Sequence, residues 1–305
     1  MRKQVSIFIY LILILLTHPA QASPVTELKL DYAEGESSTS LSFDATNDLI
    51  MINATINGKG PFRFVVDTGA SHHVMTPELA QSLGLKGKGN GVLDTGSQAK
   101  VSAELVQVAE VGLGNFKLQR QSFFVTPFPA LFPFQGFLGA ELFKHFVVRI
   151  DFRRTVLTLT LPRAFRYQGN GIALPIKFHE ALIPQVKAEV DGHPGFFKLD
   201  TGFNGSVALF REFIDEHRLL AKYRPRKSDT GARTLTEEAN GMPSAEIREF
   251  KLGPFALDGV VAFFFLDDQG SNSVFAGAIG TGVLKQFNVI IDYEKQRVLL
   301  ESGDR

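Results

Sequence analysis

The chain of 305 residues contains no cysteine. A disulfide framework, thiolate chemistry and cysteine-ligated metal sites are therefore excluded. The chain also lacks an excess of charge of either sign, since 32 Lys and Arg residues balance 32 Asp and Glu residues. Because nucleic-acid-binding proteins normally carry a basic excess, we expect no nucleic-acid partner.

A membrane-spanning run, which needs about 20 apolar residues as a helix, is also missing. The apolar run Ile7–Leu16 is shorter, follows Arg2 and Lys3, and leads to a small-x-small sequence that ends at Ala22. This order is typical of a secretory signal peptide, with an uncleaved anchor as the alternative. We expect residues 1–22 to be removed by cleavage after Ala22 and the mature protein to be periplasmic or secreted, without a membrane association.

The length that remains fits two domains of about 100 to 150 residues each. The sequence also repeats itself, with an offset of 133 residues at the first Asp-Thr-Gly and 141 at the closing Asp. Asn57-Gly58 leads to Asp67-Thr68-Gly69, and Asp191-Gly192 leads to Asp200-Thr201-Gly202. Both intervening segments are rich in aromatic and β-branched residues, so each copy predicts a hairpin turn followed by a strand.

The similarity between the two copies continues downstream. Thr76–Leu83 and Phe210–His217 each predict a short helix, the first with Thr76 as N-cap and Pro77 in the first turn. Three further pairs of segments match: 113–116 with 252–255, 137–139 with 278–280, and 146–159 with 287–300. The last pair predicts a strand, a charged turn and a strand in each copy.

Short strands separated by Gly and Pro turns are typical of an all-β fold of barrel or sandwich type. We therefore expect two pseudo-symmetric all-β lobes, each with one short helix. The charged, Gly-containing stretch 162–171 predicts the boundary between them. The expected lobes span residues 23–163 and 164–305.

The sequence Val65–Ser71, Val-Val-Asp-Thr-Gly-Ala-Ser, resembles the active-site motif of the retropepsin-like and pepsin-like aspartic proteases. In that superfamily each lobe supplies one Asp-Thr/Ser-Gly loop, a flap follows, and a hydrophobic-hydrophobic-Gly segment passes beneath the loop. The match of pattern covers nearly all of residues 45–303. The resemblance implies two acid-protease lobes in one chain with a cleft between them, a peptide or protein substrate, no cofactor or metal, and a monomer.

The resemblance further implies that Asp67 and Asp200 are the catalytic pair. One carboxylate takes a proton from water while its protonated partner donates to the carbonyl oxygen. Two carboxyls held close together share a proton and titrate as a pair. The residues expected to support the two loops are Thr68, Gly69, Ser71, Thr201, Gly202 and Asn204.

The triplet Asp-Thr-Gly occurs four times, beginning at Asp67, Asp94, Asp200 and Asp229. No apolar strand leads into Asp229, and Asp94 follows a Gly-rich stretch. Asp94 and Asp229 lie where the family places its flaps, so we expect both triplets to form turns in the flaps. The predicted flap residues are Gly96, Ser97, Gly231 and Ala232. The second loop departs from the first, since Phe203 and Asn204 replace Ala and Ser.

Two other features receive a structural interpretation. His72 and His73 are neighbours in sequence and would point to opposite faces of a strand, and no partner lies at a zinc spacing, so we expect them on the surface. The phenylalanines at 123–137 and 263–265 are expected mainly in the core, with some lining the cleft and favouring apolar substrate side chains.

The sequence thus predicts an aspartic endopeptidase. One alternative is a catalytically silent module of the same two-lobed fold that grips an extended peptide by strand addition. A second alternative pairs Asp67 with Asp67 of another copy. The asymmetry between the two motifs favours the pair within one chain.

Overall fold

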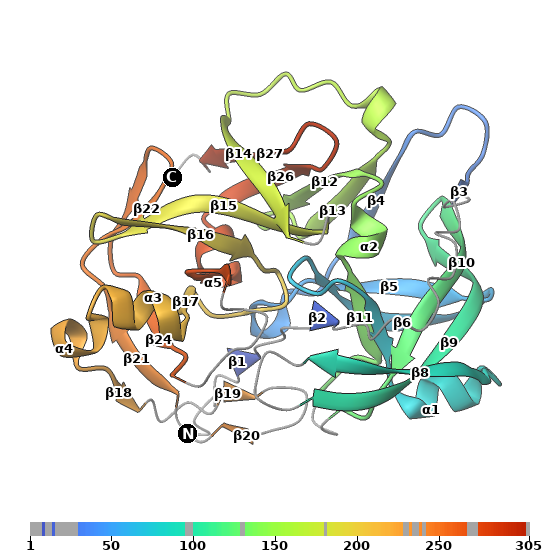
Figure 1. Cartoon of the computed structure of the whole chain (residues 1–305). Helices are drawn as coiled ribbons and strands as arrows, with labels where there is room; N and C mark the ends of the chain where they lie inside the picture. The colour runs from blue at the N-terminus through green and yellow to red at the C-terminus, as the bar shows by residue number, and fades with distance from the viewer. Residues whose placement is uncertain are drawn as a thin grey trace, which may run out of the picture.

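The computed structural model describes residues 8–9, 14–15, 30–94, 100–128, 132–179, 182–227, 232–233, 238–239, 242–266 and 274–302. Strands dominate these ranges and the helices are short, so the predicted all-β class is confirmed (Figure 1). The predicted signal peptide lies almost entirely outside the described residues. None of the helices in these ranges combines the length and the apolar content that a membrane crossing requires.

The first half of the chain contains a closed barrel. Its strands follow the order β9-β5-β6-β11-β7-β10, and β10 pairs with β9 to close the ring. Strand β8 extends β9 as a hairpin, and β3 lies antiparallel to β10. The bounds are β3 Leu30–Asp31, β5 Met51–Ile56, β6 Lys59–Asp67, β7 His73–Met75, β8 Gly87–Asp94, β9 Lys100–Leu113, β10 Phe116–Val125 and β11 Gly136–Gly139.

The second half repeats the central part of this arrangement. Strand β25 pairs in parallel with β16 and antiparallel with β17, as β11 pairs with β6 and β7. Strand β24 then pairs in parallel with β17, as β10 pairs with β7. The bounds are β15 Ile183–Val190, β16 His193–Leu199, β17 Val207–Leu209, β18 Arg226–Lys227, β21 Pro243–Glu246, β22 Phe250–Leu252, β23 Phe255–Leu257, β24 Val261–Phe264 and β25 Gly277–Ile279.

A sheet built from both halves joins them, in the order β4-β13-β12-β26-β27-β14. Its central pair is antiparallel, with Arg149 of β12 opposite Ile290 of β26. The bounds are β4 Ser38–Ser42, β12 Val147–Asp151, β13 Val156–Thr160, β14 Ile172–His179, β26 Phe287–Asp292 and β27 Arg297–Ser302. The predicted lobe boundary at 163/164 falls in the 3₁₀ helix Pro162–Ala164, between β13 and β14, and the division into two domains stays a prediction.

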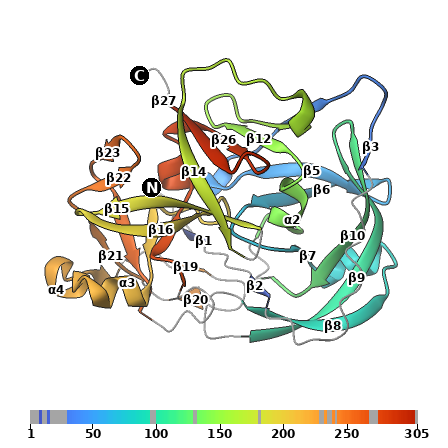
Figure 2. The same ribbon diagram turned by 45° about the horizontal axis from the view of Figure 1, so that its top comes forward.

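Short strands of the N-terminal part lie between the two halves in both views (Figures 1 and 2). Strand β2 (Ile14–Leu15) is antiparallel to β8, and β1 (Phe8–Ile9) is parallel to β19 (Ala232–Arg233). Strand β19 pairs in turn with β20 (Glu238–Ala239). The N-terminal strands β2 and β1 therefore pair with a strand of the first half and a strand of the second half, respectively.

The local turn and helix predictions are confirmed. Asn57-Gly58 joins β5 to β6 and Asp191-Gly192 joins β15 to β16, all with positive φ, the combination that suits a tight hairpin. Helix α1 (Pro77–Ser82) begins after Thr76, whose side chain accepts a hydrogen bond from Leu79 N at 3.2 Å. Helix α3 (Arg211–Glu216) matches the second copy.

The expectation of one helix in each half is wrong. The described chain also forms α2 (Ala140–Phe143) and α5 (Thr281–Leu284), each directly after a hydrophobic-hydrophobic-Gly strand, and α4 (Leu219–Tyr223) after α3. A single turn of helix carries too short a periodic pattern to be distinguished from a loop in the sequence.

Two apolar clusters flank the two Asp-Thr-Gly loops, beside the main core. The first-loop cluster includes Val65, Ala70, Phe124, Phe134 and Phe137. The second-loop cluster includes Ile183, Phe203, Ala208, Phe210, Phe263, Phe265, Phe275 and Ala278. The described phenylalanines of both predicted runs are buried or partly buried, as expected for core residues.

Replacing Phe197 by alanine should destabilise the fold. Its ring is fully buried on β16 and meets the rings of Phe213 and Phe250 edge to face, with centroids 5.7 Å apart in each pair. We expect Phe197→Ala to lower the free energy of unfolding by about 3–5 kcal/mol, measured by denaturant titration. Ile172→Ala, at a position 42% exposed on β14, should cost below about 1 kcal/mol; an equal loss in both variants would contradict the packing argument.

Candidate active site

Asp67 and Asp200 both stand at the carboxyl ends of parallel strand pairs. Asp67 ends β6 and lies opposite Gly139 of β11. Asp200 follows β16, whose last residue, Leu199, lies opposite Ile279 of β25. The two carboxylates therefore occupy equivalent places in the two halves. The structure brings them together within one chain.

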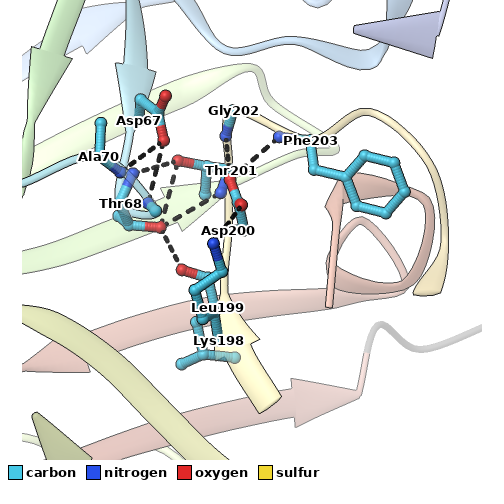
Figure 3. A network of polar contacts seen from close by, with 10 residues as sticks. Asp67, Thr68, Ala70, Lys198, Leu199, Asp200, Thr201, Gly202 and Phe203 are labelled. Carbon is cyan, nitrogen blue, oxygen red and sulfur yellow. Dashed lines mark hydrogen bonds and ion pairs between the residues drawn. The ribbon is translucent and has the colours of Figure 1, made fainter. Parts of the chain in front are cut away.

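The two loops are tied together by Thr68 and Thr201 (Figure 3). The Thr68 hydroxyl donates to Leu199 O and the Thr201 hydroxyl donates to Val66 O, both at 2.7 Å. In addition, Thr68 N donates to Thr201 Oγ1 at 3.0 Å, and Thr201 N donates to Thr68 Oγ1 at 3.2 Å. Each threonine thus satisfies backbone groups of the opposite loop in a fully buried position.

Backbone N–H groups orient one oxygen of each carboxyl. Asp67 Oδ1 accepts from Gly69 N at 2.9 Å and Ala70 N at 3.0 Å. Asp200 Oδ1 accepts from the amides of Gly202 and Phe203, both at 3.1 Å. In the part of the chain that the structure describes, Oδ2 of both residues is buried without a hydrogen-bond partner. One oxygen of each carboxyl is therefore held by the backbone of its own loop, and the other makes no hydrogen bond among the described residues.

Two glycines set how closely the carboxyls approach. A Cβ atom on Gly69 would lie 2.3 Å from Asp200 Cγ, and a Cβ atom on Gly202 would lie 2.4 Å from Asp67 Cγ. Such distances are too short for any side chain, so each carboxyl packs directly against the loop that carries the other. The sequence motif requires glycine here for this close approach.

The environment makes the two carboxyls unequal. Burial raises the pKa of Asp67 well above its usual value, and the negative charge of Asp200 raises it further. Burial also raises the pKa of Asp200, to about 6, but the nearby Lys198 ammonium and the two backbone N–H groups oppose that rise. The Lys198 ammonium opposes the rise in pKa at both carboxyls and lies within ion-pair distance of Asp200.

Lys198 is the site residue that the sequence interpretation missed. Its side chain is fully buried, and its Nζ lies 3.8 Å from Asp200 Oδ2. The available signal was a lysine two residues before Asp200 in an otherwise apolar strand end, where the alternation of a strand places both side chains on one face. The corresponding residue before Asp67 is Val65.

The remaining predicted loop residues lie beside the pair with different contacts. Ser71 Oγ is buried and has no hydrogen-bond partner among the described residues. Asn204 donates from Nδ2 to Asn47 O at 2.8 Å, which ties the second loop to a segment of the first half. Glu141, in the first turn of α2, donates from its backbone N to Ser71 O at 3.2 Å.

The predicted flap residues are described only in part. Asp94 ends β8 and pairs with Lys100 of β9, so the first predicted flap is a hairpin whose connection, including Gly96 and Ser97, lies outside the described residues. Asp229 and Gly231 also lie outside them. Ala232 belongs to β19 and pairs with Ala239 and Phe8. The flap role of these residues stays a prediction.

The expectation that both histidines lie on the surface is wrong for His73. It is fully buried on β7, where its Nδ1 accepts a hydrogen bond from Gly139 N at 3.0 Å and its Nε2 lies 3.4 Å from Gln121 Oε1. Burial lowers its pKa, which fits a neutral ring. His72 is partly exposed, with Nδ1 3.0 Å from Glu141 Oε2. No cluster of possible metal ligands occurs in the described ranges.

Comparison with known proteins agrees with the resemblance seen in the sequence. Residues 52–142 match a family model described as aspartyl protease. A solved structure, that of a retropepsin-like aspartic protease from Rickettsia conorii, matches with 22% sequence identity and a TM-score of 0.32, covering 45% of this chain and 97% of that chain. The sequence matches none of the curated proteins with which it was compared. The family match bears out the predicted superfamily for residues 52–142, a range that includes Asp67 and ends before Asp200.

Removing the Thr68 hydroxyl should weaken the contact between the loops. Thr68→Val keeps a similar volume but leaves Leu199 O and Thr201 N unpaired in a buried place. We expect the free energy of unfolding to fall by about 1–3 kcal/mol, and less in Thr68→Ser. Thr158→Val, which removes an exposed hydroxyl pair with Ser40, serves as the matched control. A loss as large at Thr158 as at Thr68 would refute the special role of this contact.

The raised pKa of Asp200 predicts how stability depends on pH. In the unfolded chain this carboxyl ionises near pH 3.9, whereas in the folded protein it stays protonated up to about 6. The folded state therefore binds more protons in this window, and the wild type loses stability as pH rises through it. We expect the stability of Asp200→Asn relative to wild type to increase by about 2–3 kcal/mol between pH 3.5 and 7, measured by denaturant unfolding.

Asp44 provides a control of opposite sign. The hydrogen bond from the Thr46 hydroxyl lowers the pKa of this exposed carboxyl, burial opposes that effect, and the Thr46 backbone N–H and the charge of Arg63 lower the pKa further. Its contribution is present above the unfolded pKa and is lost as the pH falls. The stability of Asp44→Asn relative to wild type should therefore fall as pH rises; the same trend in both variants would show that the buried pair is not responsible.

Proposed function

We propose that the chain is an aspartic endopeptidase in which Asp67 and Asp200 together activate water. Residues 52–142 match the family model of aspartyl proteases. The observation that supports this proposal most directly is the apposition of two buried carboxyls through reciprocal threonine hydrogen bonds. The family match supports a protease-type function for the first half. The role of Asp200 is inferred from the internal repeat and from the position of its carboxyl beside Asp67.

The proposed reaction needs no group besides the two carboxyls and a water molecule. The ionised carboxyl accepts a proton from water, whose oxygen attacks the carbonyl carbon of the peptide bond. The protonated carboxyl donates its proton to the carbonyl oxygen. Because one proton is shared by the pair, the same site supplies the base and the acid.

The pairing of strands favours an extended peptide as substrate. Strands β2 and β1 add to the edges of β8 and β19, one from each half, through main-chain hydrogen bonds. Main-chain pairing of this kind accepts any sequence in an extended conformation. If residues 1–22 are removed as the sequence predicts, both edges are left for a substrate strand. The apolar clusters beside the loops favour apolar side chains in that strand.

Four asparagine variants test the proposal. Asp67→Asn and Asp200→Asn should each reduce kcat/KM for an unfolded protein substrate to the background of the assay, since each removes a proton-transferring carboxyl. Asp94→Asn and Asp229→Asn carry the same change in the other two Asp-Thr-Gly triplets and should stay within about threefold of wild type, because a turn residue tolerates Asn. Kinetics between pH 4 and 8 provide the measurement.

Two outcomes would count against the proposal. Cleavage that survives in either dyad variant, or is lost equally in all four variants, would remove Asp67 and Asp200 from the chemistry. A correctly folded wild-type protein that binds peptides but cleaves none of a broad library would support the catalytically silent binding module.

A further inference from the structure

A buried cation stands beside only one of the two matching strand ends. Lys198 is fully buried, with Nζ 3.8 Å from Asp200 Oδ2. The rings of Phe210 and Phe275 lie around the same ammonium, each with its centroid 5.6 Å from Nζ. The residue at the equivalent position before Asp67 is Val65, which is fully buried in the first-loop cluster.

The ammonium is costly to bury unless its charge is compensated. Transfer of a charged group from water to an apolar interior is strongly unfavourable. Two aromatic faces attract a cation but do not neutralise it. An ionised Asp200 supplies a compensating negative charge, and its Oδ2 lies 3.8 Å from Nζ. Lys198 and an ionised Asp200 therefore stabilise each other.

The hydrogen bonds within the two loops do not distinguish the carboxyls, since both accept two backbone N–H groups on Oδ1. The position of Lys198 does distinguish them, because its charge also acts on Asp67 but its ammonium lies within ion-pair distance of Asp200. We propose, on the basis of the function proposed above, that Lys198 is a positioning residue that keeps Asp200 ionised as the general base and leaves the shared proton on Asp67, the general acid.

The proposed direction of proton transfer balances over one cycle. Asp200 takes a proton from water as the water oxygen bonds to the carbonyl carbon, and Asp67 gives its proton to the carbonyl oxygen. The resulting diol collapses when the C–N bond breaks, the nitrogen takes the proton from Asp200, and one hydroxyl returns its proton to Asp67. The products are a carboxylic acid and an amine, and the pair returns to its starting state.

Few other titratable groups surround this cluster in the described chain. Asp67 faces Asp200 from β6. The strands on either side of β16 place Gln185 and Ala278 opposite Lys198, and neither titrates. His179, at the end of β14, contacts the ring of Phe275 edge to face, with centroids 5.1 Å apart. A control variant at His179 therefore accompanies the substitutions of Lys198.

Lys198→Met tests the proposal, because methionine keeps an unbranched side chain and removes the charge. Without the ammonium, Asp200 ionises at higher pH, so the acid limb of the pH profile of kcat/KM should move up by about one unit or more. Lys198→Arg keeps the charge and should leave the limb near its wild-type position. Lys198→Gln, a neutral polar replacement, covers the case in which Lys198→Met does not fold, and His179→Gln should not move the limb.

A second readout does not depend on activity. In protein labelled with ¹³C at the aspartate carboxyls, the titration of Asp200, assigned with Asp200→Asn, should shift to higher pH in Lys198→Met or Lys198→Gln. If the titration of Asp200 shifts in a protein that cleaves no substrate, the proposed endopeptidase function is wrong but the effect of Lys198 on the two carboxyls is supported. If the variants are active with a lower kcat, but the acid limb and the carboxyl titration stay unchanged, the proposed role of Lys198 is wrong. A purely structural loss would change neither of these two readouts.

Discussion

The constraint on which the structure depends is the close approach of two carboxyls that lie 133 residues apart in the sequence. Like charges resist this approach, and burial adds to the cost. The reciprocal bonds between Thr68 and Thr201 hold the loops together with backbone groups that would otherwise be unpaired. If the two carboxyls share a proton, the remaining repulsion is relieved, and the same arrangement can supply an acid and a base.

The surrounding strands make that approach rigid. The strand of each aspartate pairs in parallel with another strand. Strand β11 pairs with the strand that ends at Asp67, and β25 pairs with the strand that precedes Asp200. At a greater distance, the pairing of β12 with β26 joins the halves through main-chain hydrogen bonds. The loops are therefore fixed relative to each other at the threonine contact and again in the joining sheet.

The internal repeat in the sequence was sufficient to predict the hairpin turns, α1, α3 and the all-β class, because each of these depends on local pattern. It was not sufficient for His73 and Lys198. Both are polar side chains in strands, where alternation assigns a face but does not say what covers that face. The buried ring of His73 is accommodated because Gly139 N donates to its Nδ1 and Gln121 Oε1 lies 3.4 Å from its Nε2. Lys198 is accommodated because the rings of Phe210 and Phe275 lie around its ammonium.

A duplicated chain permits a difference that two identical subunits cannot have. If two copies of one chain formed the pair, a lysine before one aspartate would stand before the other as well. Two ammonium groups would favour ionisation of both carboxyls, and the pair would lose the proton that the acid must donate. In a single chain, Lys198 can replace the valine of one copy while Val65 remains in the other. The backbone can thus stay nearly symmetric, as carboxyl apposition requires, while the side chains provide the asymmetry that acid–base chemistry requires.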